Sequence, residues 1–112
     1  MRIGLLAPPW LPVPPPAYGG TEMAVDVLAR GLSALGHDVV LFSCDESSTP
    51  VERRSDGPAA PRSEMGNGAV ELRHLLAGRA ALADCDVIHD HTLLGPFCHR
   101  SDESTPIVAT VH

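Results

Sequence analysis

Residues 2–22 read RIGLLAPPWLPVPPPAYGGTE and join an apolar run, a proline-rich loop and a pair of glycines. The stretch from Arg2 to Ala7 is short and almost wholly apolar, which is typical of a strand buried on both faces of a parallel sheet. The loop after it ends at Gly19 and Gly20, just before a stretch with helical periodicity. This order of strand, loop and helix indicates an α/β fold with the glycines at a strand-to-helix junction.

The two glycines have two interpretations. Because they carry no Cβ, a phosphate group could approach their backbone N–H groups closely, and the positive end of the following helix dipole would attract it. The alternative is an ordinary turn in which glycine supplies a positive φ. Gly19 and Gly20 do not by themselves decide between an anion-binding loop and a turn.

The stretch after the glycines predicts a helix capped by Thr21 and ended by Gly36. Its apolar positions at helical spacing are Ala24, Leu28, Gly31, Leu32 and Leu35. A second apolar run, Val39 to Phe42, then predicts a strand. A strand, helix and strand connected in this way are expected to form a right-handed parallel unit.

Residues 45–68 change to Ser, Pro, Gly and charge, with almost nothing to bury, and predict a long mobile surface loop. An amphipathic helix from Val70 to Ala83 follows, with a short strand at 69–72 as a further possibility. Two more strands are predicted at 87–89 and 107–111. The pattern favours a Rossmann-like α/β domain with an open parallel sheet over residues 1–112. Since no helix follows to cover the last strand, we expect an incomplete domain that self-associates through its exposed sheet edge.

The composition excludes several classes of protein. The chain has 112 residues, is 44% hydrophobic and has 14 acidic residues against 8 Lys+Arg, for a formal charge of −6. A nucleic-acid partner is therefore not expected. The N-terminal apolar run is too short for a signal peptide or a membrane span, so we expect a cytoplasmic protein whose membrane association, if it has one, is peripheral. Three cysteines without CxxC spacing predict reduced thiols.

Histidines follow two of the predicted strands. His89-Asp90-His91 ends one strand and His112 ends the last. In an open parallel sheet, ligands bind at the carboxyl ends of the strands, so these side chains and Gly19-Gly20 are expected at one edge. His89 and His91 should project to the same side, with Asp90 opposite. They could act in acid–base chemistry or hydrogen bonding, or as metal ligands with Cys98, His99 or His112. The alternative is that one of the two, His89 ahead of His91, is a buried structural histidine.

The remaining rings have simpler interpretations. His37 and His74 are predicted to face solvent, and Trp10 to fix the proline-rich loop to the domain. Tyr18, beside the glycines, is more open to a ligand. A dinucleotide-binding loop is disfavoured because GxGxxG does not follow the first strand, and a P-loop is excluded because the sequence has no Lys.

Four ordered segments, PPWLPVPPPAYGGTE, LARGLSALGHDVVLFS, DVIHDH and PIVATVH, resemble the start of family 4 glycosyltransferases of the GT-B fold. The resemblance implies a retaining enzyme with two Rossmann-like domains, which transfers a sugar from a nucleotide-sugar to an acceptor in the cleft between them and needs no metal or other cofactor. It implies that Gly19 and Gly20 approach the donor diphosphate and that catalytic His112 contacts the donor sugar. His91 would line the cleft on the acceptor side, and Tyr18 and Glu22 match motif positions.

The resemblance also implies a partner domain that carries most of the nucleotide site, and no such domain is present in these residues. We therefore expect the 112-residue chain alone to be inactive. The alternative is a non-catalytic α/β module that binds a nucleotide or a partner through the same edge. Donor, sugar and acceptor do not follow from the sequence.

Overall fold

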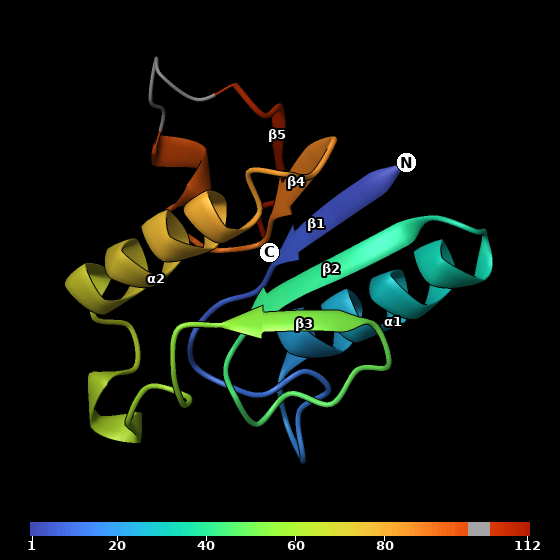
Figure 1. Cartoon of the computed structure of the whole chain (residues 1–112). Helices are drawn as coiled ribbons and strands as arrows, with labels where there is room; N and C mark the ends of the chain where they lie inside the picture. The colour runs from blue at the N-terminus through green and yellow to red at the C-terminus, as the bar shows by residue number, and fades with distance from the viewer. Residues whose placement is uncertain (99–103) are drawn as a thin grey trace.

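A computed structural model, which describes residues 1–98 and 104–112, has an all-parallel sheet between two α-helices (Figure 1). The elements in chain order are β1 (Arg2–Leu6), α1 (Gly20–Ala34), β2 (Asp38–Ser43), β3 (Glu52–Ser55), the 3₁₀ turn η1 (Arg62–Glu64), α2 (Gly68–Ala81), β4 (Val87–Asp90), the 3₁₀ turn η2 (Gly95–Phe97) and β5 (Ile107–Ala109). The strand order is β3-β2-β1-β4-β5. The predicted Rossmann-like open parallel sheet is confirmed.

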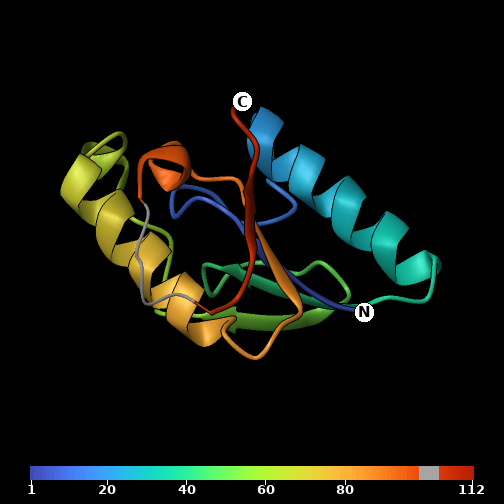
Figure 2. The same ribbon diagram turned by 90° about the horizontal axis from the view of Figure 1, so that it is seen from above.

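The helices cover opposite faces of the sheet, with α1 on one side and α2 on the other (Figure 2). Alternate residues of the central strand β1 serve the two faces: Leu5 packs in the cluster that contains Val25 of α1, and Leu6 in the cluster that contains Leu75 of α2. Both leucines are fully buried. This two-sided burial explains why β1 is an uninterrupted apolar run.

The helix α1 ends as predicted but begins differently. Gly36, at φ +93, follows its last turn, a conformation that glycine adopts without strain. The predicted cap by Thr21 is wrong, because the N-cap is Gly19 and no side chain caps the helix. The buried face holds Glu22, Val25, Asp26 and Ala29, while the predicted core positions Ala24, Gly31 and Leu35 are exposed. Because two of the four buried residues, Glu22 and Asp26, are charged, the apolar pattern of the sequence does not mark the buried face of α1.

The predicted loop at 45–68 contains β3, which pairs in parallel with β2, and the turn η1. Its sequence there, ERRS, is mostly exposed because β3 is the edge strand, so it shows no apolar pattern. Before β3, the buried Thr49 places Oγ1 2.7 Å from Asp26 Oδ1 of α1. The expectation of a loop with nothing to bury is therefore wrong in this part, while its mobility stays a prediction.

The helix α2 begins at Gly68, where the Asn67 side chain accepts hydrogen bonds from the N–H groups of residues 69 and 70, so the possible strand at 69–72 is absent. Gly78 brings the helix close to the sheet: a Cβ there would lie 2.4 Å from Leu6 Cδ1. His74, predicted to face solvent, is buried, and its Nε2 is 2.8 Å from the carbonyl oxygen of Ala7. His74 thus contacts the chain directly after the carboxyl end of β1.

The strand β5 forms the other edge of the sheet, paired with β4 alone. The side chain of Val108 is 54% exposed, as expected for a strand that no helix covers. An unpaired strand edge presents free backbone groups to other chains. Self-association through this edge stays a prediction.

Candidate functional site

The candidate site lies where the strand order reverses. The connection through α1 leads from β1 to β2 on one side, and the connection through α2 brings β4 to the other side of β1. The loops that leave β1 and β4 therefore diverge at their carboxyl ends, which is the position where open α/β sheets bind ligands. The loop after β1 is the proline-rich stretch, and the loop after β4 begins at His91.

A groove of about 1120 Å³ opens at this reversal point. Its walls come from the β1–α1 loop, the first turn of α1, the segment around η1, the loop after β4 and the end of the described chain. All six residues predicted for the site line it, namely Tyr18, Gly19, Gly20, Glu22, His91 and His112. Residues almost a hundred positions apart in the sequence thus share one concave surface.

Gly19 and Gly20 differ in the space that surrounds the position of a Cβ atom. Gly19 has an extended backbone with φ 171, Gly20 is the first residue of α1, and neither adopts the left-handed conformation, so the interpretation as a glycine-dependent turn is wrong. A Cβ on Gly19 would lie 2.9 Å from Pro15 Cβ, so close packing of the loop requires glycine there. A Cβ on Gly20 would meet nothing within 4 Å. Packing therefore does not account for Gly20, which leaves the helix N-terminus open to the groove.

Glu22 stands in the first turn of α1 and is only 5% exposed. Burial raises the pKa of its carboxyl, while its own backbone N–H and the nearby His112 oppose the rise. The helix dipole favours a carboxylate in this turn. A buried carboxyl group that lines a groove at a helix N-terminus is suited to bind a hydroxyl group or to carry a proton.

Three histidine rings lie side by side at the carboxyl ends of β4 and β5, with their planes tilted to one another. The ring centroids of His89 and His91 are 3.9 Å apart, and those of His91 and His112 are 5.2 Å apart. This confirms that His89 and His91 project to one side. His89 Nε2 is 2.6 Å from Thr110 Oγ1, so its partner is a side chain and not the backbone. Burial, followed by the neighbouring His89 and His112, lowers the pKa of His91 to about 4.

The loop that carries His91 is anchored by a buried ion pair that the sequence did not predict. Arg79 of α2 places Nη2 3.0 Å from Asp90 Oδ2, and Asp90 is fully buried. The other carboxylate oxygen accepts hydrogen bonds from the N–H and hydroxyl groups of Thr92. Gly95 packs directly on this carboxylate, where a Cβ would lie 2.7 Å from it. No local pattern links an arginine in the last turns of a helix to an aspartate that ends a strand.

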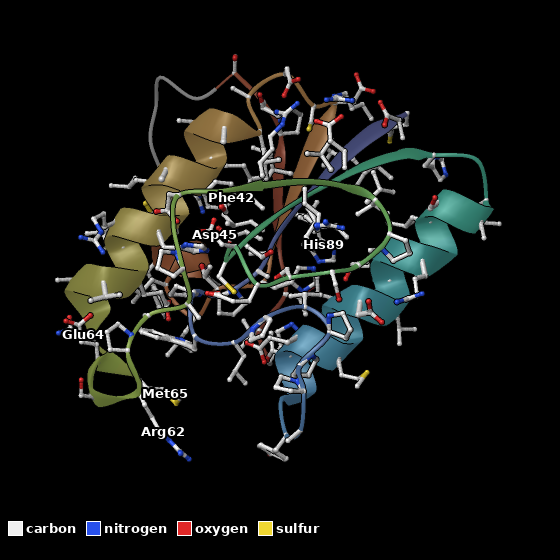
Figure 3. The ribbon with its side chains drawn as sticks, turned by 60° about the horizontal axis from the view of Figure 1, so that its bottom comes forward. Phe42, Asp45, Arg62, Glu64, Met65 and His89 are labelled. Carbon is white, nitrogen blue, oxygen red and sulfur yellow. The ribbon has the colours of Figure 1, made fainter. Side chains whose placement is uncertain are left out.

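The sequence also missed residues of the outer wall of the groove. Arg62 and Met65 line it from the turn η1 and the residue after it, and both project away from the sheet (Figure 3). Glu71 of α2 is buried at the groove and accepts a hydrogen bond from Leu94 N at 2.7 Å. The described lining of the groove thus contains two buried carboxyl groups and a single arginine.

The described residues hold no group of three or more His, Cys, Asp or Glu side chains placed to bind a metal ion. His99, one of the residues considered as a ligand, lies outside the described residues. The three cysteines are free thiols. Within the described part of the chain, no helix is long and apolar enough to span a membrane.

Comparison with protein families gives a match over residues 18–112 to the model of Glycosyltransferase Family 4. The chain belongs to this family. The matched region begins at Tyr18 and includes every residue predicted for the site. The resemblance stated from the four sequence segments is thereby confirmed.

A solved structure with the same fold is AviGT4, described as a glycosyltransferase involved in avilamycin A biosynthesis. It matches with a TM-score of 0.58 and 23% sequence identity over 100% of this chain. The family 4 chain described here spans 32% of the AviGT4 chain. A search of curated protein sequences with the 112-residue chain gives no match.

Proposed function

We propose that this chain is the N-terminal, acceptor-side part of a retaining glycosyltransferase that transfers a sugar from a nucleotide-sugar to an acceptor hydroxyl group. The observation that carries the proposal is the groove: an open helix N-terminus at Gly20 and the ring of His112 line the same concave surface. Family membership supports the reaction class.

The diphosphate of the donor is proposed to lie against the first turn of α1. The N–H groups of Gly20 and Thr21 have no backbone acceptor within the helix, because the first intrahelical bond runs from Met23 N to Gly19 O, while the N–H group of Glu22 interacts with its own carboxyl. As the bond between the sugar and the diphosphate breaks, negative charge grows on the leaving phosphate. Fixed N–H dipoles stabilise such charge without reorganisation, which lowers the barrier.

The histidines are proposed to serve the sugar end of the donor and the acceptor. His112 would contact the sugar near the reacting carbon, and His91 and Tyr18 would line the acceptor side. Tyr18 is 91% exposed, so its ring is free to stack on a ligand. The single arginine on the described groove wall supports a second, more basic wall contributed by another domain of a GT-B enzyme.

The proposal is tested by assaying the full-length gene product with a panel of nucleotide-sugars and hydroxyl acceptors, without added metal. We expect release of nucleoside diphosphate and a glycoside whose anomeric configuration, measured by ¹H NMR, matches that of the donor. The variant His112→Ala should lose about a hundredfold in kcat, as enzymes do when one stabilising group is removed. The matched control is His37→Ala, because His37 precedes β2 and lies outside the groove.

Three results would contradict the proposal: an inverted product, equal activity of the two histidine variants, or no turnover of any nucleotide-sugar. Nucleotide binding without turnover would favour the non-catalytic module instead. The 112-residue chain, assayed beside the full-length product, is expected to give only the background rate, because it supplies one wall of the cleft.

A further inference from the structure

The ring of His91 lies between two other histidine rings at the base of the groove. Its ring packs against that of His89, with centroids 3.9 Å apart and planes tilted by 38°, and its Nδ1 is 3.0 Å from Nε2 of His112. His89 is itself held by Thr110, whose Oγ1 is 2.6 Å from Nε2. His91 therefore has little freedom to turn, and its contact with His112 has a fixed geometry.

The hydrogen bond between His91 and His112 needs one proton. A neutral imidazole has one N–H and one bare nitrogen, so either His91 Nδ1 donates to His112 Nε2 or the reverse. Burial together with two neighbouring histidines lowers the pKa of His91 to about 4, so the ring is neutral at physiological pH. Its position of protonation then decides the direction of the bond.

The other nitrogen of His91 settles this choice. His91 Nε2 is buried and has no hydrogen-bond partner among the described residues. A buried N–H group without an acceptor is rarer in proteins than a buried acceptor without a donor. The bare nitrogen is therefore Nε2, and the proton lies on Nδ1, which faces His112.

We propose that His91 is a positioning residue: it donates its Nδ1–H to Nε2 of His112 and so holds His112 as the tautomer protonated at Nδ1. His112 then offers a donor at a fixed place on the groove wall, suited to an oxygen of the sugar or of the phosphate that leaves it. This last step rests on the proposed function, whereas the tautomer of His112 does not.

The tautomer is measured directly by two-bond ¹H–¹⁵N correlation NMR of the histidine-labelled full-length gene product. We expect His112 to carry its proton on Nδ1 in the wild type. His91→Asn should keep this state, because the Asn amide nitrogen occupies nearly the place of Nδ1. His91→Gln, whose amide lies nearer the place of Nε2, and His91→Phe, which has no donor, should shift His112 toward the Nε2–H form that free histidine prefers in water. His37→Gln identifies an unrelated histidine signal and should leave His112 unchanged.

The proposal is overturned if wild-type His112 is protonated at Nε2, or if Asn and Gln at position 91 give the same tautomer. The Asn and Gln variants suffice for this comparison if His91→Phe does not fold. In the transfer assay, His91→Phe should lower kcat about tenfold, as for the loss of one hydrogen bond, and His91→Asn should recover most of it. An enzyme without transfer activity but with the expected tautomers would disprove the proposed function and leave the role of His91 intact.

Discussion

The polar side chains at the amino ends of the strands differ in burial and pairing from those at the carboxyl ends. At the amino ends of the strands, Arg2 pairs with Asp38, Glu52 and Asp84, and the guanidinium of Arg54 reaches the same Glu52 and Asp84. These groups are exposed or half-buried. The hydrogen bond from the Arg54 guanidinium is the main cause that lowers the pKa of Asp84 to about 2.

At the carboxyl ends, polar groups are buried, and one nitrogen lacks a hydrogen-bond partner among the described residues. Glu22 and His91 are each 5% exposed, and His91 Nε2 has no partner among the described residues. Burying such groups costs stability, whereas exposed ion pairs change it little. The charged groups at the amino ends of the strands are thus exposed or half-buried and paired, whereas Glu22 and His91 at the carboxyl ends are buried beside the groove. The following experiments test this contrast.

The largest effect is expected from Arg79→Met. It leaves the fully buried carboxylate of Asp90 without its cation, and breaking one partner of a buried pair costs about 3–5 kcal/mol in the free energy of unfolding. Urea denaturation measures the change. A loss below about 1 kcal/mol would show that this pair does not anchor the loop after β4.

Acid should destabilise the carboxyl edge through His91. Its pKa in the folded state, about 4, lies below the ordinary value of 6.5, so the stability it contributes is present above pH 6.5 and is lost as the pH falls toward 4. The shift corresponds to about 3 kcal/mol. Between pH 7 and pH 4, His91→Asn should therefore lose about that much less free energy of unfolding than the wild type. The control His37→Asn should follow the wild type, and an identical acid response of His91→Asn would contradict the assignment.

A methyl group at Gly20 should separate binding from stability. Since a Cβ there meets nothing within 4 Å, Gly20→Ala is expected to fold normally and to gain up to about 1 kcal/mol from helix propensity. Affinity for inorganic pyrophosphate, measured by calorimetry, should nevertheless fall about tenfold, or about 1.4 kcal/mol.

The matched control for this change is Gly31→Ala, in the same helix, where a Cβ also meets nothing within 4 Å but the groove is distant. It should gain similar stability and bind pyrophosphate like the wild type. Equal affinity of the two variants would remove Gly20 from the anion site.

The smallest effect is expected at the amino edge. Arg54→Met, matched to Arg79→Met, removes a half-exposed partner of Glu52 and Asp84 and should cost less than about 1 kcal/mol. Because salt screens exposed pairs, this loss should shrink further at 1 M NaCl. A loss as large as that of Arg79→Met would erase the contrast between the two edges.

Most of the architecture could be predicted because it depends on local patterns. The buried strands are apolar runs, Gly36 ends α1, and the rule for open sheets brings Gly20, His91 and His112 to one edge. Elements whose packing lies elsewhere in the chain could not be predicted. The edge strand β3 has polar side chains on both faces and therefore no apolar alternation.

The finer parts of the site depend on contacts between distant residues. His74 contacts the Ala7 carbonyl, 67 positions away in the sequence, and His91 meets His112 through the pairing of β4 with β5. The sequence could not decide between a turn and an anion-binding loop at Gly19 and Gly20, because the two differ in backbone angles. The structure excludes the turn, because neither glycine adopts the left-handed conformation that such a turn requires.

The central claim is that the carboxyl edge binds the donor diphosphate at the first turn of α1. Titration of the ¹⁵N-labelled gene product with inorganic pyrophosphate, followed by amide chemical shifts, tests it most directly. The account predicts the largest saturable shifts at the N–H groups of Gly20, Thr21 and Glu22, with little change around Arg2 and Arg54. Shifts centred on those two arginines, or none at the first turn of α1, would contradict it.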